Sequence, residues 1–176
     1  MITLFMVKSF ILAVALGTAL YFDIRYCRIK NSVTYPAAVG GFLINFAEYG
    51  TPGLLFALKG WLIPVLALFV FYYINVMGAG DIKLFAAIGA IMGVSFVMYC
   101  FLFSVYIGGI IACGLLIRRK QFMYRMKMVC GYAKTVFLTG GLFPYGIKGD
   151  NNSKFIFTAA IVPGTIVNWV LLYLNF

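Results

Sequence analysis

The stretch Asn75-Val-Met-Gly-Ala-Gly-Asp-Ile-Lys-Leu-Phe-Ala-Ala-Ile-Gly-Ala-Ile-Met-Gly93 lies between two long apolar segments and places an acid and a lysine at their junction. The chain holds four acids, and two of them, Asp23 and Asp81, stand at the ends of apolar runs. An acid beside hydrocarbon costs free energy unless a neighbouring group compensates for it, so it is a candidate functional residue. Asp23 and Asp81 are therefore the first candidate functional residues of this chain.

Composition predicts an integral membrane protein. Of the 176 residues, 64% are hydrophobic and 10% are charged, whereas soluble domains carry about 25% charged residues. Apolar runs of about 20 residues, the length that crosses a bilayer, follow one another along nearly the whole chain. The net charge of +10 does not indicate nucleic-acid binding, because the basic residues separate apolar runs instead of lining a polar face. We predict an all-α, multi-pass protein of the plasma membrane that forms a single domain.

The residue types present narrow the possible chemistry. The absence of histidine removes serine–histidine and cysteine–histidine catalysis. The four cysteines form no CxxC pair, so no zinc site is predicted. We therefore expect no metal and no cofactor, and any chemistry must run on carboxylates, lysines or hydroxyls.

Six apolar segments are predicted to cross the membrane as helices. They are residues 1–22, 35–49, 54–77, the two halves of 82–117, and 155–174. Residues 82–117 carry no charge except Lys83 and are too many for one span of about 20 residues. We expect the break at Gly93-Val94-Ser95, which leaves a short helix after Asp81 and places this acid a little below the membrane surface.

Basic residues set the predicted orientation. With both termini outside the cytoplasm, twelve of the fourteen Lys and Arg residues fall in inner loops, and only Lys8 and Lys59 do not. This bias is the positive-inside signature of cytoplasmic loops. Residues 118–154 hold eight of these basic residues among apolar ones, which predicts an amphipathic segment on an anionic inner leaflet. The same parity places Asp23 and Asp81 at the cytoplasmic face.

The two acids can meet at one depth although 58 residues separate them. Two carboxylates brought together share a proton, because neighbouring like charges cannot both ionise. Such a pair can activate water with one member and polarise a carbonyl with the other. The alternative is that each acid only neutralises nearby Arg25 or Lys83, and the composition does not decide between the two.

Glycines accompany the second acid in Gly78-Ala-Gly80-Asp81. They allow the backbone to lie close to an acid and let an extended substrate approach. This is not a dinucleotide fingerprint, because no preceding strand and no third glycine stand at the needed spacing. Glu48 and Asp150 are predicted to be solvated. The Gly89-x-x-x-Gly93 pattern is a possible helix-packing face.

Two segments together resemble the type IV prepilin peptidases, which are membrane aspartyl proteases of the GxGD kind. Met77–Leu84, MGAGDIKL, followed by AAIG at 86–89, is similar to the family's signature around its second aspartate. Asp23-Ile-Arg-x-x-Arg-Ile-x-Asn31, followed by Thr34 and Pro36, is similar to the segment around its first. The resemblance covers the whole chain.

The resemblance implies an aspartic-type endopeptidase that cleaves the leader of prepilins or pilin-like proteins, with Asp23 and Asp81 as the catalytic pair. By the same resemblance, Gly78, Gly80 and Lys83 would form the active-site loop. The chain is similar to the short tight-adherence-type or preflagellin enzymes, because no paired CxxC insert of the kind associated with methyl transfer is present.

This sequence departs from the family pattern at two places. Lys30 stands where the family usually has proline, and Phe155-Ile-Phe157 stands where the last span usually opens with an Ile-Pro-Phe-like element. Neither place includes an acid.

Two functions other than peptidase activity predict different features. A small ion-coupled transporter would also use paired intramembrane acids, but it would show internal repeats and acids near the midplane. A non-catalytic assembly component would tolerate replacement of either aspartate by asparagine.

Overall fold

The chain is helical throughout its described part. The computed structural model describes residues 2–74, 76–118 and 156–174, together with residues 127, 131, 134, 135 and 138. Its helices are α1 (Ile2–Tyr26), α2 (Asn31–Tyr49), α3 (Thr51–Tyr73), α4 (Ala79–Met92), α5 (Val94–Arg118) and α7 (Thr158–Leu174). No strand occurs among these residues. The predicted all-α class and the predicted break at Gly93 are confirmed, whereas most of the predicted amphipathic segment 118–154 lies outside the described residues.

Helix boundaries differ from the predicted ones near the junctions. α1 continues past the predicted end at residue 22 to Tyr26, so Asp23 lies in the last turn of the helix. α2 begins at Asn31, before the predicted start at residue 35, because polar residues suit the first turn of a helix. α3 ends early because the backbone N–H groups of Val76 and Met77 both bond to the carbonyl of Phe71 and turn the chain.

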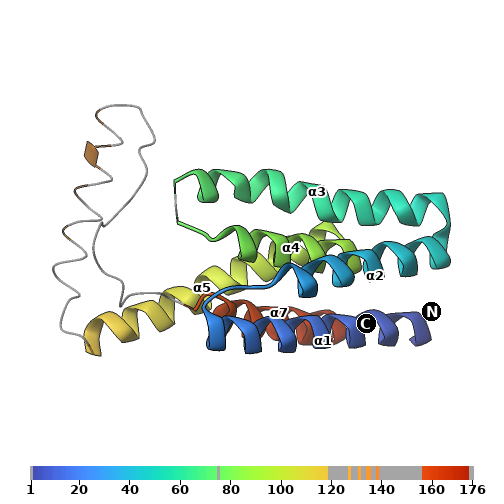
Figure 1. Cartoon of the computed structure of the whole chain (residues 1–176), viewed down its shortest axis with the longest axis horizontal. Helices are drawn as coiled ribbons and strands as arrows, with labels where there is room; N and C mark the ends of the chain where they lie inside the picture. The colour runs from blue at the N-terminus through green and yellow to red at the C-terminus, as the bar shows by residue number, and fades with distance from the viewer. Residues whose placement is uncertain are drawn as a thin grey trace.

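Consecutive helices run in opposite directions (Figure 1). The end of α1, the start of α2, the end of α3 and the start of α4 gather at one end of the bundle, where α7 begins and beyond which α5 extends. The two chain termini lie toward the opposite end. The sequence segments that carry Asp23 and Asp81 therefore meet at the same end of the bundle.

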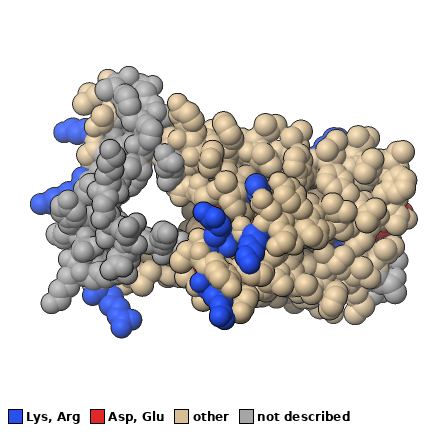
Figure 2. Space-filling model, viewed as in Figure 1, with Lys and Arg blue, Asp and Glu red and all other residues tan. Residues whose placement is uncertain are grey.

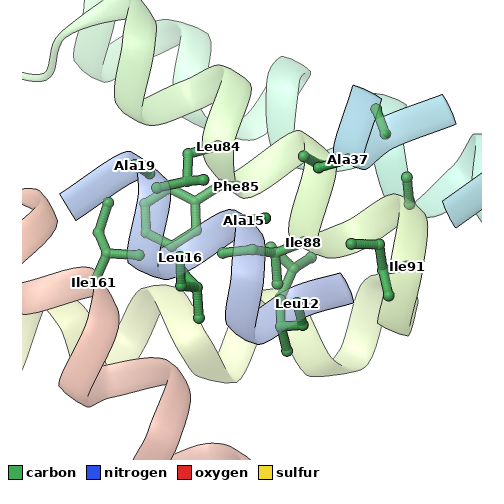
Figure 3. Close-up of a cluster of buried hydrophobic side chains, with 14 of the residues drawn as sticks. Leu12, Ala15, Leu16, Ala19, Ala37, Leu84, Phe85, Ile88, Ile91 and Ile161 are labelled. Atoms are coloured by element: carbon green, nitrogen blue, oxygen red, sulfur yellow. The ribbon is translucent and has the colours of Figure 1, made fainter. Parts of the chain in front are cut away.

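α4 forms the centre of the bundle. It packs against α1, α2, α3 and α5, and its residues from Leu84 to Ile91 are all buried. A helix that is apolar all round is stable only when it is enclosed. Figure 3 shows how side chains of α4 meet neighbours from α1, α2 and α7, with labels on Leu84, Phe85, Ile88, Ile91, Leu12, Ala15, Leu16, Ala19, Ala37 and Ile161.

Among the described residues, three helices are long and apolar enough to cross a membrane. They cover Leu4–Tyr26, Thr51–Tyr73 and Val94–Leu115, and α7 is a shorter apolar helix. Large apolar side chains such as Leu66 and Leu102 are exposed on their outer faces, as expected of surfaces that contact lipid. The coarse prediction of a membrane protein therefore agrees with the structure.

Glycines bring α3 and α4 into direct backbone contact. A Cβ atom on Gly89 of α4 would overlap the carbonyl oxygen of Gly60 on α3, and the converse also holds. One turn later, Gly93 takes a φ of +91° and lies under the ring of Phe56. The predicted packing face at Gly89 and Gly93 is confirmed, and its partner is α3.

Candidate active site

Asp23 and Asp81 come together from α1 and α4. Asp23 lies in the last turn of α1 and is 8% exposed. Asp81 lies in the first turn of α4 and is half-buried. The two carboxylates are close enough for their charges to act on each other. Both side chains also line the same two cavities.

The linker between α1 and α2 holds this arrangement. Cys27 adopts a positive φ of 48°, and its N–H donates to the carbonyl of Asp23, which ends α1. The linker then turns so that Ile29 is buried against Gly80. A Cβ on Gly80 would lie 3.1 Å from the Cβ of Ile29, so a glycine at this position allows the start of α4 to approach the end of α1.

Gly78, the other glycine of the loop, lies next to the Asp81 carboxylate. The Asp81 N–H donates to the Gly78 carbonyl at 3.1 Å. A Cβ on Gly78 would lie 3.2 Å from Oδ2 of Asp81. The two predicted loop glycines therefore both lie near the acids. Gly78 is next to Asp81, and Gly80 is next to Ile29 in the linker that follows α1.

Two cavities of different polarity meet at the carboxylates. The larger, of about 640 Å³, is mostly apolar, and its wall includes Phe71, Val76, Met77, Phe101, Val105, Gly108, Gly109, Ala112, Ile156 and Phe157. The smaller, of about 360 Å³, is lined by Arg28, Ile29, Asn31, Ala79, Gly80 and Lys83. Asp23, Cys27, Gly78 and Asp81 belong to both walls. A chain lying across the acids would therefore contact a mostly apolar wall in the larger cavity and a wall with more charged and polar groups in the smaller.

The basic neighbours of the acids have other partners. Nζ of Lys83 donates to Oδ1 of Asn31 at 3.0 Å and lies over the ring of Tyr35. Nη1 of Arg25 donates to the hydroxyl of Tyr21 at 3.3 Å. Within the described part of the chain, no ion pair includes Asp23 or Asp81. The direct ion pairs that the alternative would produce, between either acid and Arg25 or Lys83, are therefore not formed among the described residues.

Lys30, which stands where the family usually has proline, lies outside the smaller cavity. Its ammonium group lies 4.4 Å from the ring centre of Phe22 and 4.8 Å from that of Tyr26. Cations are attracted to the faces of aromatic rings. Lys30 thus holds the linker against α1 and forms no ion pair with Asp23 or Asp81.

The prediction that Glu48 is solvated is wrong. Glu48 forms an ion pair with Lys8, and the two side chains are only 11% and 12% exposed. Both residues lie on apolar helices that pack together, where an unpaired charge would be costly. Asp150 lies outside the described residues.

Several residues of the cavity walls were not predicted from the sequence. Asn31 fixes Lys83, and one face of α5 forms a wall of the larger cavity. Gly108, Gly109 and Ala112 are small residues on that face, and their spacing in the sequence is a signal from which this wall could have been predicted. The residues that the structure describes contain no cluster of three or more His, Cys, Asp or Glu that could hold a metal ion.

The comparisons with known proteins agree with the resemblance of the motifs. The sequence profile of the type IV leader peptidase family matches residues 10–113, more than half of the chain and a segment that includes both acids. A prepilin leader peptidase/N-methyltransferase from Vibrio cholerae is 35% identical over 88 residues, which cover 47% of this chain and 35% of that protein. The match thus spans about a third of that relative's length, and no solved structure matches. The chain belongs to the type IV leader peptidase family.

Proposed function

We propose that the protein is an aspartic-type membrane endopeptidase that removes the leader peptide of prepilins or pilin-like proteins at the cytoplasmic membrane face. The observation that carries this proposal is the meeting of two carboxylates, unpaired with any described cation, at the junction of two cavities. Family membership supplies the substrate class. The N-methyltransferase activity in the relative's name is not part of the proposal.

The proposed reaction is hydrolysis of a peptide bond by water. One carboxylate of the Asp23–Asp81 pair is ionised and takes a proton from water, and the water oxygen bonds to the scissile carbonyl carbon. The other carboxyl group is protonated and hydrogen-bonds the carbonyl oxygen. The C–N bond then breaks, and a proton held by the pair passes to the leaving nitrogen.

The loop residues position the substrate in this proposal. Gly78 and Gly80 carry no side chain between the acids and an approaching peptide. Lys83 is held by Asn31 and Tyr35 at the wall of the smaller cavity. Its ammonium group can donate to backbone carbonyls of a peptide in that cavity.

The proposed membrane placement has six spans, with both termini extracytoplasmic. The alternating helix directions support it (Figure 1). Figure 2 shows Lys and Arg side chains gathered at the end of the bundle where α1 ends and α4 begins, which is expected at an anionic inner leaflet. The 14 residues of α4 extend about 21 Å, less than the roughly 30 Å of a hydrocarbon core. Asp81 therefore lies below the cytoplasmic surface and is reached through the cavities.

Asparagine substitutions test the proposal. Asp23→Asn and Asp81→Asn keep the side-chain shape but can neither take nor deliver the proton, so each should reduce cleavage by a factor on the order of 10⁴. The double variant should be hardly worse than either single variant, because the two acids act as one unit. Activity should rise and then fall with increasing pH, because only the form with one shared proton is active.

The assay uses a prepilin-like peptide in liposomes with equal amounts of each folded variant. Glu48→Gln is the control, since Glu48 carries a carboxylate that lines neither cavity. It removes the partner of Lys8 and should lower stability, but the folded variant should keep its activity. If either Asp→Asn variant retained more than a few per cent of activity, the two-aspartate mechanism would be wrong.

A further inference from the structure

One face of α5 forms a long wall of the larger cavity. Its lining residues are Phe101, Val105, Gly108, Gly109 and Ala112. Their spacing of four, three, one and three residues keeps them on one side of a helix. From Phe101 to Ala112 the wall extends about 16 Å along the helix axis. The large side chains stand deeper in the bundle, and the small ones lie toward the end where α1 ends and α4 begins (Figure 1).

The two glycines of this face differ in what surrounds them. Gly108 is buried, and a Cβ there would lie 3.3 Å from both Ala160 and Phe157, so this glycine lets α5 pack against α7. Gly109 is exposed, and a Cβ there would meet nothing within 4 Å. Packing therefore explains Gly108 but does not explain Gly109, whose missing side chain leaves open space in the cavity.

The cavity can hold more than a water molecule. Its volume of about 640 Å³ lies within the roughly 300–1,000 Å³ of typical ligand pockets. Apart from the two acids at its edge, its wall is built mostly of apolar side chains such as Phe71, Met77 and Val105. The matching occupant of such a wall is an apolar side chain.

We propose that Gly109 is a specificity-determining residue that makes room for a bulky apolar side chain next to the scissile bond. The occupant is the apolar flank of the substrate, because the two carboxylates lie in the wall of this mostly apolar cavity, whereas the wall of the smaller cavity includes Arg28, Asn31 and Lys83. This inference rests on the proposed peptidase function and adds a subsite to it.

The test compares two substrates and two variants. The substrates are prepilin-like peptides that differ only in the first residue of the apolar flank, which is phenylalanine in one and alanine in the other. Gly109→Leu should reduce kcat/KM for the phenylalanine peptide by about 10-fold or more, since lost room in an apolar pocket has effects of this size. It should leave the alanine peptide within a few-fold of the wild-type value. Gly109→Ala should shift the ratio in the same direction by less.

Gly114→Leu is the matched control. Gly114 lies on the same helix, is exposed with nothing within 4 Å of an added Cβ, and lines neither cavity. It should change neither rate. The inference is overturned if folded Gly109→Leu and Gly109→Ala lower both peptides equally or lower neither. If the wild-type protein cleaves neither peptide, the proposed function itself fails, and this outcome is distinct from a wrong subsite.

Discussion

Alanine at Gly89 should damage both stability and cleavage, because it forces α3 and α4 apart. The added Cβ would overlap the carbonyl oxygen of Gly60 and lie 2.8 Å from its carbonyl carbon. Ordinary contacts of a Cβ begin at about 3.4 Å, so the carbonyl carbon alone requires a local separation of 0.6 Å, and the nearer carbonyl oxygen requires more. Neither atom of the clash belongs to a side chain that can rotate away, so the helices themselves must move.

The size of the effect follows from this displacement. Overpacking of a well-packed core costs about 1–3 kcal/mol, whereas alanine in place of glycine inside an open helix gains about 1 kcal/mol. Gly17→Ala on α1, where an added Cβ meets nothing within 4 Å, is the matched control. Both replacements carry this gain, so the two variants should differ by the overpacking cost, roughly 1–3 kcal/mol, in the free energy of unfolding.

Cleavage should fall as well, because α4 carries Asp81 two turns before Gly89. A misplacement of about 1 Å at a catalytic group can cost about 100-fold in rate, so we expect Gly89→Ala to lose 10-fold or more. Denaturant unfolding in detergent measures the stability, and cleavage of a prepilin-like peptide measures the rate. Equal stability and equal activity of Gly89→Ala and Gly17→Ala would refute the close contact between α3 and α4.

Three further predictions concern the end of α4, the chemistry and the topology. Asn45→Leu should destabilise the protein by about 1–3 kcal/mol, because its buried amide donates to the carbonyls of Ala90 and Ile91, which would lose their partner; unfolding in detergent measures this. Cleavage should be unchanged by chelators, since the proposed mechanism uses only two carboxylates and water; a loss that added zinc restores would contradict it. A cysteine placed at Lys134 should resist a membrane-impermeant thiol reagent added outside intact cells, and its labelling from outside would contradict the proposed orientation.

Several features of the fold followed from the sequence alone. Hydropathy is a property of each segment by itself, so the composition and the apolar runs were enough to predict a helical membrane protein. The break at Gly93 followed from the length of residues 82–117, which exceeds one span. The family resemblance rested on short motifs around Asp23 and Asp81, and the match over residues 10–113 bears out the family.

Helix boundaries were less predictable. The charged and polar residues between the apolar runs marked the ends of the predicted spans, but α1 continues past Asp23 to Tyr26. A helix keeps its hydrogen bonds through a charged residue when packing permits, and hydropathy does not report packing. Asp23 was expected to end the first span and lies in the last turn of α1, which is a few residues longer than the apolar run.

The sequence by itself determined the class of protein, the number of apolar segments and the identity of the acids worth testing. Only the tertiary structure decided that α4 is the central helix, that Gly60 lies against Gly89, that Glu48 is paired with Lys8, and that α5 lines the larger cavity. The physical reason is that all the helices are similarly apolar, so hydrophobicity cannot rank their partners. Partners are chosen by the shapes and few polar groups of helix faces far apart in the chain, and those faces meet only in the folded bundle.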